Sequence, residues 1–281
     1  MLKKSGLVLS IALALFLLQG CGGGSSGSGS TSSPAFSVGN WFKPAVATTW
    51  QWQLQGTVNS GYDVDLYDID LSDSPASLIA DLQAAGRRVI CYFSAGSYED
   101  FRPDAAQFLA SDKGNALQGF ANEQWLDIRS ANVRAIMQAR IELARQKGCD
   151  GIEPDNVDGY TNNTGFPLSA ADQLSYNQFL AVEAHTRGLS VGLKNDIDQA
   201  AQLVNYFDFS INEQCHEFNE CDMLSVFINA GKPVFNAEYA SNFVNDPVQR
   251  QALCADALAR SFRTLILPPA LDDSFRFSCD P

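Results

Sequence analysis

Short apolar runs alternate along most of the chain with longer segments whose apolar residues recur at helical spacing. Each short run is bounded by turn residues, which is typical of buried strands in an α/β protein. The predicted strands cover residues 50–54, 64–70, 88–94, 125–128, 148–158, 190–195, 207–213 and 233–239, and the clearest predicted helices cover 131–147 and 170–187. Eight strands in about 240 residues, mostly separated by helices, favour a single-domain (β/α)8 TIM barrel. The alternative is an open doubly wound sheet, although no Gly-rich phosphate fingerprint follows the first strand.

The strand in residues 148–158 breaks the pattern expected of a buried strand. It follows the strongest helical stripe, which Gly148 ends, and it carries Glu153, Asp155 and Asp158 toward its C-terminal end. A strand covered on both faces normally presents branched apolar residues, so these carboxylates contradict their local context. Such contradictions are expected at functional sites.

Polar residues collect at the C-terminal ends of the other predicted strands as well. They are Asp68, Tyr92, Ser94, Asp127, Lys194, Asn195, Glu213, Glu238 and Tyr239. In a TIM barrel these ends converge on one face, where the catalytic groups lie. A structural ion pair or loop cap is the alternative for any single carboxylate, but it does not explain the same feature on several strands.

The sequence lacks the residues and motifs that several other kinds of catalysis require. The chain holds two histidines, His185 and His216, and the first lies on a predicted helix, which argues against a His-rich metal site. There is no Gly-x-Ser-x-Gly elbow and no Walker-type loop. We therefore expect no metal and no cofactor. Glycoside hydrolysis needs only two acids, one protonated and one ionised.

The net charge of −13, with only 19 Lys and Arg residues, makes a nucleic-acid partner improbable and favours a cationic or neutral substrate. Solubility alone is the alternative explanation for this acidity.

The N-terminal residues 1–20 have the features of a signal peptide. Lys3 and Lys4 precede an apolar run over 7–18 that is too short to span a membrane comfortably. The sequence Leu18-Gln19-Gly20-Cys21 resembles a bacterial lipobox, which predicts lipidation of Cys21, whereas an ordinary signal peptide is the alternative. Residues 21–35 form a Gly/Ser-rich linker, and 36–281 form the folded domain. The protein is then exported and either lipid-anchored to the bacterial envelope, at the outer membrane of a Gram-negative cell, or secreted; the membrane contact is the anchor alone.

Removing Cys21 leaves six cysteines in a compartment where disulfides persist. The favoured pairs are Cys215 with Cys221 and Cys254 with Cys279. Cys91 and Cys149 lie in or beside predicted core strands and could equally be buried thiols.

Several of these motifs resemble glycoside hydrolase family 114. They are residues 89–99, residues 151–158, Asn212-Glu213 and residues 236–239, and the resemblance extends over nearly all of residues 41–279. It implies a TIM-barrel endo-α-1,4-polygalactosaminidase that cleaves at least partly deacetylated galactosamine polymer. The family's catalytic pair, an Asp after the fifth strand and a Glu after the seventh, falls on Asp155 and Glu213.

Such a polymer is cationic, so carboxylates in the cleft would attract and bind its amines. The candidate substrate-binding residues are Asp65, Asp68, Tyr92, Glu153, Asp158, Lys194, Asn195, Glu238 and Tyr239. Lys194 either keeps a neighbouring carboxylate ionised or pairs with it structurally. The protein is expected to act as a monomer. Two other hypotheses are a non-catalytic binder of cationic amino polysaccharide at the cell surface and a barrel hydrolase for another polysaccharide.

Overall fold

The computed structural model describes residues 39–280. The predicted signal peptide, Cys21 and the linker lie outside the described residues. Between residues 39 and 280, no helix combines the length and apolarity that crossing a bilayer requires.

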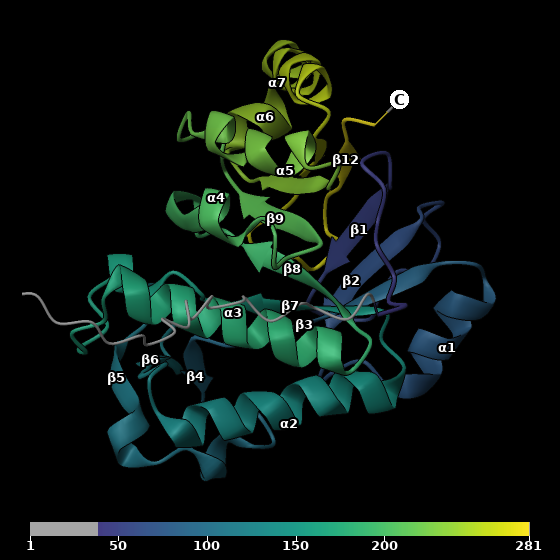
Figure 1. Cartoon of the computed structure of the whole chain (residues 1–281). Coiled ribbons are helices and arrows are strands. Elements are labelled where there is room, and N and C mark those ends of the chain that lie inside the picture. The colour runs from purple at the N-terminus through teal and green to yellow at the C-terminus, as the bar shows by residue number, and fades with distance from the viewer. Residues whose placement is uncertain (1–38, 281) are drawn as a thin grey trace, which may run out of the picture. The chain divides into compact units, whose positions relative to one another are not determined.

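A curled parallel sheet forms the centre of the fold (Figure 1). Its neighbours follow chain order, and a short antiparallel strand, β12 (Phe277–Ser278), pairs with the last parallel one. The parallel strands are β1 (Trp50–Gln53), β2 (Leu66–Asp70), β3 (Arg88–Ser94), β7 (Gly151–Asp155), β8 (Ser190–Lys194), β9 (Phe209–Glu213), β10 (Val234–Glu238) and β11 (Arg263–Ile266). The Trp50 indole donates to the Arg263 carbonyl at 2.9 Å, which joins the first and last parallel strands. The predicted single-domain TIM-barrel fold is confirmed.

One predicted barrel strand is wrong. The run at 125–128 contributes to β6 (Glu123–Leu126), which pairs antiparallel with β4 (Ser97–Glu99) and β5 (Lys113–Ala116) in a separate sheet. The eighth parallel strand is instead β11, a four-residue segment beginning with Arg263. A short apolar run shows that a segment is buried but not which partner it pairs with. Asp155 and Glu213 consequently end the fourth and sixth barrel strands, not the fifth and seventh.

Helices cover the outside of the sheet, and α2 and α3 lie side by side (Figure 1). The predicted helix 131–147 is α2, which begins where the Ser130 hydroxyl accepts from the amides of Asn132 and Val133 and ends at Gly148 with φ 89°. The α-helices are α1 (Ala76–Ala84), α2 (Ala131–Lys147), α3 (Ala170–Thr186), α4 (Ala200–Leu203), α5 (Ser225–Asn229), α6 (Ser241–Asn245) and α7 (Pro247–Ala259). Short 3-10 turns are η1 (Ala105–Gln107), η2 (Ala110–Asp112), η3 (Gly159–Thr161), η4 (Ile197–Gln199) and η5 (Cys221–Leu224).

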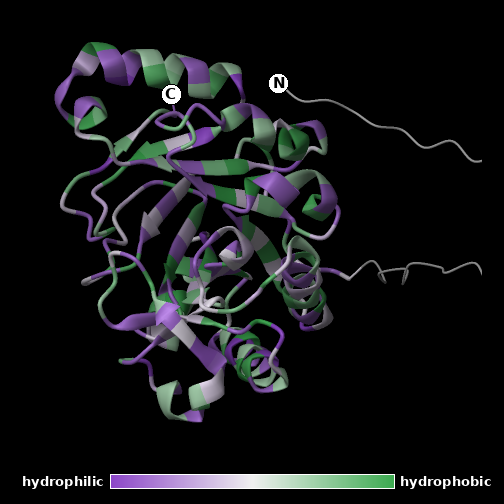
Figure 2. Cartoon of the chain, turned by 90° about the vertical axis from the view of Figure 1, so that its left-hand side faces the viewer, coloured by the Kyte–Doolittle hydropathy of each residue, from purple (hydrophilic) through white to green (hydrophobic). Residues whose placement is uncertain are grey.

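Two apolar layers follow from the alternation of side chains along each strand. Phe209 and Ile211 of β9 pack inside the barrel with Trp50, Trp52 and Phe235, whereas the larger cluster lies between the sheet and the helices. Helices of the outer layer carry both hydrophobic and hydrophilic residues (Figure 2), as expected of amphipathic helices on a core. Inside the barrel, apolar residues give way to charged ones at the C-terminal strand ends, which places the site there.

Three disulfides fix this framework. Cys215 pairs with Cys221 and Cys254 with Cys279, which are the two pairings favoured by the sequence. Cys91 of β3 pairs with Cys149, just before β7, over a Cα–Cα distance of 6.1 Å. The sequence did not decide whether Cys91 and Cys149 are paired or are buried thiols. The structure joins them in a disulfide beside β7.

Candidate active site

One lysine holds three carboxylates at the C-terminal ends of neighbouring strands. Lys194 Nζ lies 3.1 Å from Glu153 Oε1, 3.2 Å from Asp155 Oδ1 and 3.3 Å from Glu213 Oε2. Glu153 and Asp155 are two residues apart on β7 and so face the same side of the sheet. Lys194 and Glu213 are the last residues of β8 and β9. Register between parallel strands thus brings together residues that are about 60 apart in sequence.

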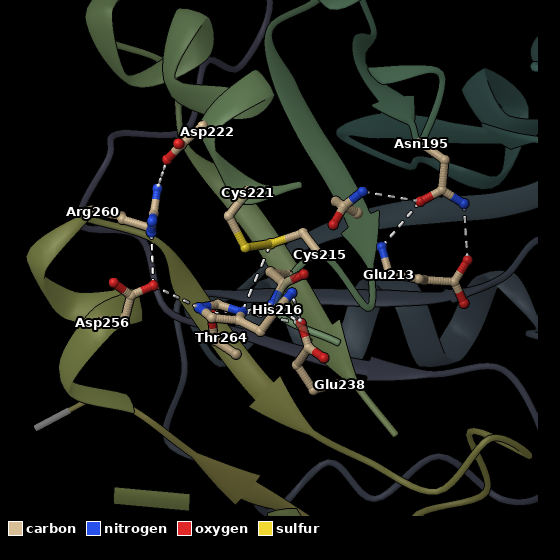
Figure 3. The surroundings of a disulfide bond; sticks show 12 residues. Asn195, Glu213, Cys215, His216, Cys221, Asp222, Glu238, Asp256, Arg260 and Thr264 are labelled. Carbon is tan, nitrogen blue, oxygen red and sulfur yellow. Dashed lines mark hydrogen bonds and ion pairs between the residues drawn. A yellow bond between two sulfur atoms is a disulfide. The ribbon is translucent and has the colours of Figure 1, made fainter. Parts of the chain in front are cut away.

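Asp155 and Glu213 are the members of this group that solvent reaches, with side chains 17% and 27% exposed. The Tyr92 hydroxyl donates to Asp155 Oδ2 at 3.0 Å, and the Tyr239 hydroxyl donates to Glu213 Oε1 at 2.6 Å. Asn195 donates to Glu213 Oε2 at 3.1 Å and accepts from the Glu213 amide at 3.0 Å (Figure 3). Each carboxylate is therefore held in one orientation by donors to both of its oxygens.

The charge state of the site follows from these contacts. Burial alone would raise the pKa of Glu213, but Lys194, Tyr239 and Asn195 outweigh it and hold that pKa below its ordinary value. Burial would likewise lower the pKa of Lys194, but the carboxylates of Asp155 and its neighbours raise it well above the usual range. Burial and Glu213 raise the pKa of Tyr239, so its hydroxyl remains a donor. Glu213 is thus an ionised carboxylate at neutral pH.

Two further acids lie beneath this pair inside the barrel. Glu153 is fully buried, and its Oε2 accepts from the Trp52 indole at 3.1 Å. Asp68 is also fully buried, and burial together with the neighbouring Glu153 raises its pKa well above the ordinary value. Asp68 therefore lies under the site and not at its surface, contrary to its predicted substrate contact, and it is harder to ionise than an ordinary carboxyl.

An open cavity of about 680 Å³ lies over the lysine and its carboxylates. Trp52, Tyr92, Asp155, Lys194 and Glu213 form its floor. Its rim includes Phe101 and Phe120, whose side chains are exposed and offer flat apolar faces of the kind that stack on sugars. The volume is in the range of small-molecule sites.

A second cavity of about 400 Å³ also contacts Glu213. Asp158, predicted as a substrate-binding residue, lines this second cavity and not the first. Asn195, which donates to Glu213 Oε2, lines the second cavity as well. Glu213 therefore contacts both cavities.

The structure corrects two of the predicted substrate-binding positions. Asp65 precedes β2, at the opposite end of the strand from the site, and its carboxylate accepts from the Thr49 amide and hydroxyl at 2.9 Å each. Glu238 points away from the barrel interior, where its Oε1 accepts from the His216 amide at 2.9 Å (Figure 3). Both errors concern direction: being near a strand end does not say which end of the barrel or which face of the sheet a side chain occupies.

Sequence reasoning also missed residues that contact the cavities. Glu123 comes from the segment before the misassigned strand, and burial raises its pKa to about 7. Phe101 belongs to a segment to which the sequence analysis assigned no element. Asp196 lines the second cavity directly after the predicted Asn195. The only signal for Asp196 was its position beside a predicted site residue.

The described residues offer no ready metal centre. Between residues 39 and 280, the potential ligands that lie together are Cys215, His216 and Cys221. Both sulfurs are joined in a disulfide and are not thiolates that could bind a metal.

A TIM-barrel fold with convergent carboxylates above an open cleft is the arrangement of a glycoside hydrolase. The model of glycoside-hydrolase family GH114 matches residues 31–281, and the chain belongs to this family.

Solved structures agree with this assignment. Aspergillus fumigatus Ega3, in complex with galactosamine, is 45% identical with a TM-score of 0.81, over 86% of this chain and all of that one. The glycoside hydrolase domain of PelA from Pseudomonas aeruginosa is 17% identical with a TM-score of 0.64, over 82% of this chain and 98% of that one, and shows the fold alone. Trehalulose synthase MutB from Pseudomonas mesoacidophila is 11% identical with a TM-score of 0.54, over 79% and 64% of the two chains, and likewise shows only the fold. No curated protein matches the chain.

Proposed function

We propose that this protein is an endo-acting glycosidase that hydrolyses α-1,4-linked, galactosamine-containing polysaccharide, with Asp155 and Glu213 as the catalytic pair. The observation that carries the proposal is the shared contact with Lys194, which holds both carboxylates at the floor of an open cavity. Likeness to Ega3, which was solved with galactosamine, supports the amino-sugar substrate. The contact of Glu213 with two open cavities supports cleavage within a chain.

The spacing of the two carboxylates supports a double-displacement reaction. Asp155 Oδ1 and Glu213 Oε2 lie 3.2 and 3.3 Å from Lys194 Nζ. These two oxygens are therefore at most about 6.5 Å apart. Retaining glycosidases place the two carboxyl groups about 5 Å apart, whereas inverting ones need a wider gap for water. We therefore expect the product to keep the anomeric configuration of the substrate, which NMR of the first-formed product measures directly.

Replacing each catalytic carboxylate tests the proposal. Asp155→Asn and Glu213→Gln keep the shape of the side chain and should each lower kcat by at least about a thousandfold, because the amides cannot act as nucleophile or acid. The assay is the size distribution of products from deacetylated and acetylated galactosamine polymer. Asp65→Asn is the matched control, because this carboxylate lies at the opposite barrel end and should leave kcat unchanged. Activity within tenfold of wild type in either variant removes that residue from the pair.

The competing function, a non-catalytic surface binder of cationic amino polysaccharide, makes a different prediction. A binder would retain polymer on a column while releasing no shorter product, and Glu213→Gln would not change that outcome.

We also propose that the protein is exported and lipid-anchored through Cys21. The apolar run at 7–18 followed by the lipobox-like sequence supports this. Incorporation of labelled fatty acid should be lost in Cys21→Ser, and absence of label in the wild-type protein would exclude the anchor.

A further inference from the structure

A chain of hydrogen bonds leads from the small antiparallel sheet to the active site. Its first member is Glu123 of β6, whose Oε2 accepts from Ser97 Oγ at 2.7 Å. Ser97 Oγ lies 2.6 Å from Ser94 Oγ, and Ser94 Oγ accepts from Asn156 Nδ2 at 2.9 Å. We call Glu123, Ser97, Ser94 and Asn156 the serine network. It connects β6 to the turn that follows β7, next to Asp155.

Counting protons fixes the direction of each bond in the serine network. The Ser97 hydroxyl has one proton, which Glu123 accepts, so Ser94 must donate to Ser97. Ser94 Oγ accepts in turn from the Ser97 amide at 3.0 Å and from Asn156, which fills both of its lone pairs. An acceptor at position 123 therefore orders the whole network.

The two serines can influence the reaction only through their neighbours. Ser94 and Ser97 are fully buried, and neither is among the described residues that line the two cavities. Glu123 does line the larger cavity, together with Asp155. The serine network therefore joins one part of the cavity wall to another through groups that substrate cannot reach.

Asn156 is the member of the network that contacts the proposed catalytic carboxylate. Its amide donates to Asp155 Oδ1 at 2.7 Å, and the same oxygen lies 3.2 Å from Lys194 Nζ. The φ of Asn156 is 60°, in the left-handed region that residues other than Gly occupy at a cost. Such a conformation persists when surrounding contacts hold it, and here the serine hydroxyls hold the Asn156 side chain.

The backbones of the turns after β3 and β7 are also tightly packed against each other. The amides of Ala95 and Gly96 donate to the Asp155 carbonyl at 2.8 and 3.0 Å. A methyl group on Gly96 would lie 1.7 Å from the Asn156 carbonyl oxygen, so only Gly fits at this position. A movement of the turn after β3 is therefore passed on to Asn156 and Asp155.

The serine network requires an acceptor at Glu123 but not a charge. Burial raises the pKa of Glu123 to about 7, against the hydrogen bond from Ser97. The carboxylates of Glu99 and Asp155 add to this rise, and the Arg102 guanidinium opposes it. A neutral carboxylic acid keeps a carbonyl oxygen that accepts from Ser97, so the network is maintained in both protonation states.

We propose that Glu123 is a positioning residue for the glycosidase reaction, because by accepting from Ser97 it fixes the turn at Asn156 and thereby orients the Asp155 carboxylate. This inference rests on the proposed function, in which Asp155 belongs to the catalytic pair. Alignment of Asp155 matters for bond making and breaking at the sugar and not for holding the polymer. Loss of the network should therefore lower kcat and leave KM nearly unchanged.

Ser97→Ala tests the network without touching the cavity. It removes the hydroxyl that links Glu123 to Ser94, and we expect kcat on the galactosamine polymer to fall about ten- to hundredfold with KM within about threefold of the wild type. Glu123→Ala should have the same effect. The double variant should lose no more than either single one, because both break the same connection. Full kcat in Ser97→Ala overturns the inference, as does an additive loss in the double variant.

Glu123→Gln distinguishes an acceptor from a charge. Its amide oxygen can still accept from Ser97, so kcat should stay within about threefold of the wild type. Gln124→Ala is the matched control, because Gln124 lies on the other face of β6 and donates to the Gly114 carbonyl at 3.2 Å. It should leave kcat and KM unchanged. Equal losses of kcat in Glu123→Gln and Glu123→Ala contradict positioning through Ser97, and so does a Glu123→Ala variant that raises KM alone.

Thermal unfolding of each variant reports whether the fold is intact, and the two Glu123 variants carry the test if Ser97→Ala does not fold. Crystal structures need no cleavage. In Glu123→Ala, the Asn156 amide should no longer lie within hydrogen-bond distance of Asp155 Oδ1, and an unchanged contact overturns the inference.

The inference and the proposed function can fail separately. An inactive Asp155→Asn together with a fully active Ser97→Ala overturns the positioning role alone. A wild-type protein that cleaves no galactosamine polymer refutes the proposed function, while the crystal structures still decide whether the network orients Asp155.

Discussion

Lys194 is the residue whose removal should change this protein most. It is 2% exposed and compensates three carboxylates at 3.1 to 3.3 Å. With an effective dielectric constant of about 20, each such pair contributes about 5 kcal/mol of attraction before the cost of desolvating the ammonium. Lys194→Met should lower the free energy of unfolding by about 3 to 5 kcal/mol, because removing one partner leaves buried charges uncompensated. The melting temperature should fall on the order of 10 °C.

The same substitution should change the pH dependence of the reaction. Without Lys194, the pKa of Glu213 is no longer held below its ordinary value, and burial raises it. The ionised form then exists only at higher pH, so the acidic limb of the kcat/KM profile should move to higher pH. At neutral pH we expect kcat/KM to fall at least about a hundredfold.

Lys147 of α2 provides the matched control for Lys194. Its ammonium donates to the Leu71 and Ser74 carbonyls at 2.6 and 2.8 Å, outside the active site. Lys147→Met should therefore lower the melting temperature without moving the acidic limb of the profile. The reasoning fails if Lys194→Met keeps kcat/KM within threefold of the wild type and leaves the acidic limb in place.

Two further predictions concern the disulfides and the ionisation of Asp196. Replacing Cys215 and Cys221 with Ser opens a short loop and should cost about 2 kcal/mol of stability, whereas replacing Cys91 and Cys149 opens a long one and should cost about 4 kcal/mol. Only replacement of Cys215 and Cys221 should also raise KM several-fold, because that disulfide closes the loop whose Phe218 lines the second cavity. Equal KM values in the two double variants would contradict this. The pKa of Asp196 is about 8 in the fold, above the unfolded value, so the folded state binds more protons and loses stability as pH rises from about 4 to 8. Asp196→Asn should remove that loss and melt several degrees above the wild type at pH 8 but not at pH 4; an unchanged difference across this range would show that Asp196 ionises normally.

The sequence predicted the region of the candidate site because its signal was local. Glu153 and Asp155 stand where a buried strand should be apolar, and Glu213 ends another apolar run in the same way. The alternation of strands and helices then predicted that these ends would converge. The helix boundaries of α2 were equally local, since Ser130 and Gly148 specify its ends through their own backbone and side chain.

Sequence alone did not determine which way a side chain points or which strands pair. Asp65 and Glu238 have the composition of site residues, yet one lies at the far end of the barrel and the other on the outer face of β10. The segment 125–128 is as apolar as a barrel strand but pairs in the small antiparallel sheet. These outcomes depend on register and on partners distant in sequence, which no local pattern encodes.

The sequence by itself determined the barrel and the presence of acids at the strand ends, because those follow from periodicity and residue type, and its motifs carried the resemblance to the family. Only the tertiary structure decided that one lysine is shared by Glu153, Asp155 and Glu213, and that the buried Asp196 lines a cavity beside them. The physical reason is that charge pairing and burial are properties of distances across the barrel. Those distances arise only when strands from separate parts of the chain lie side by side.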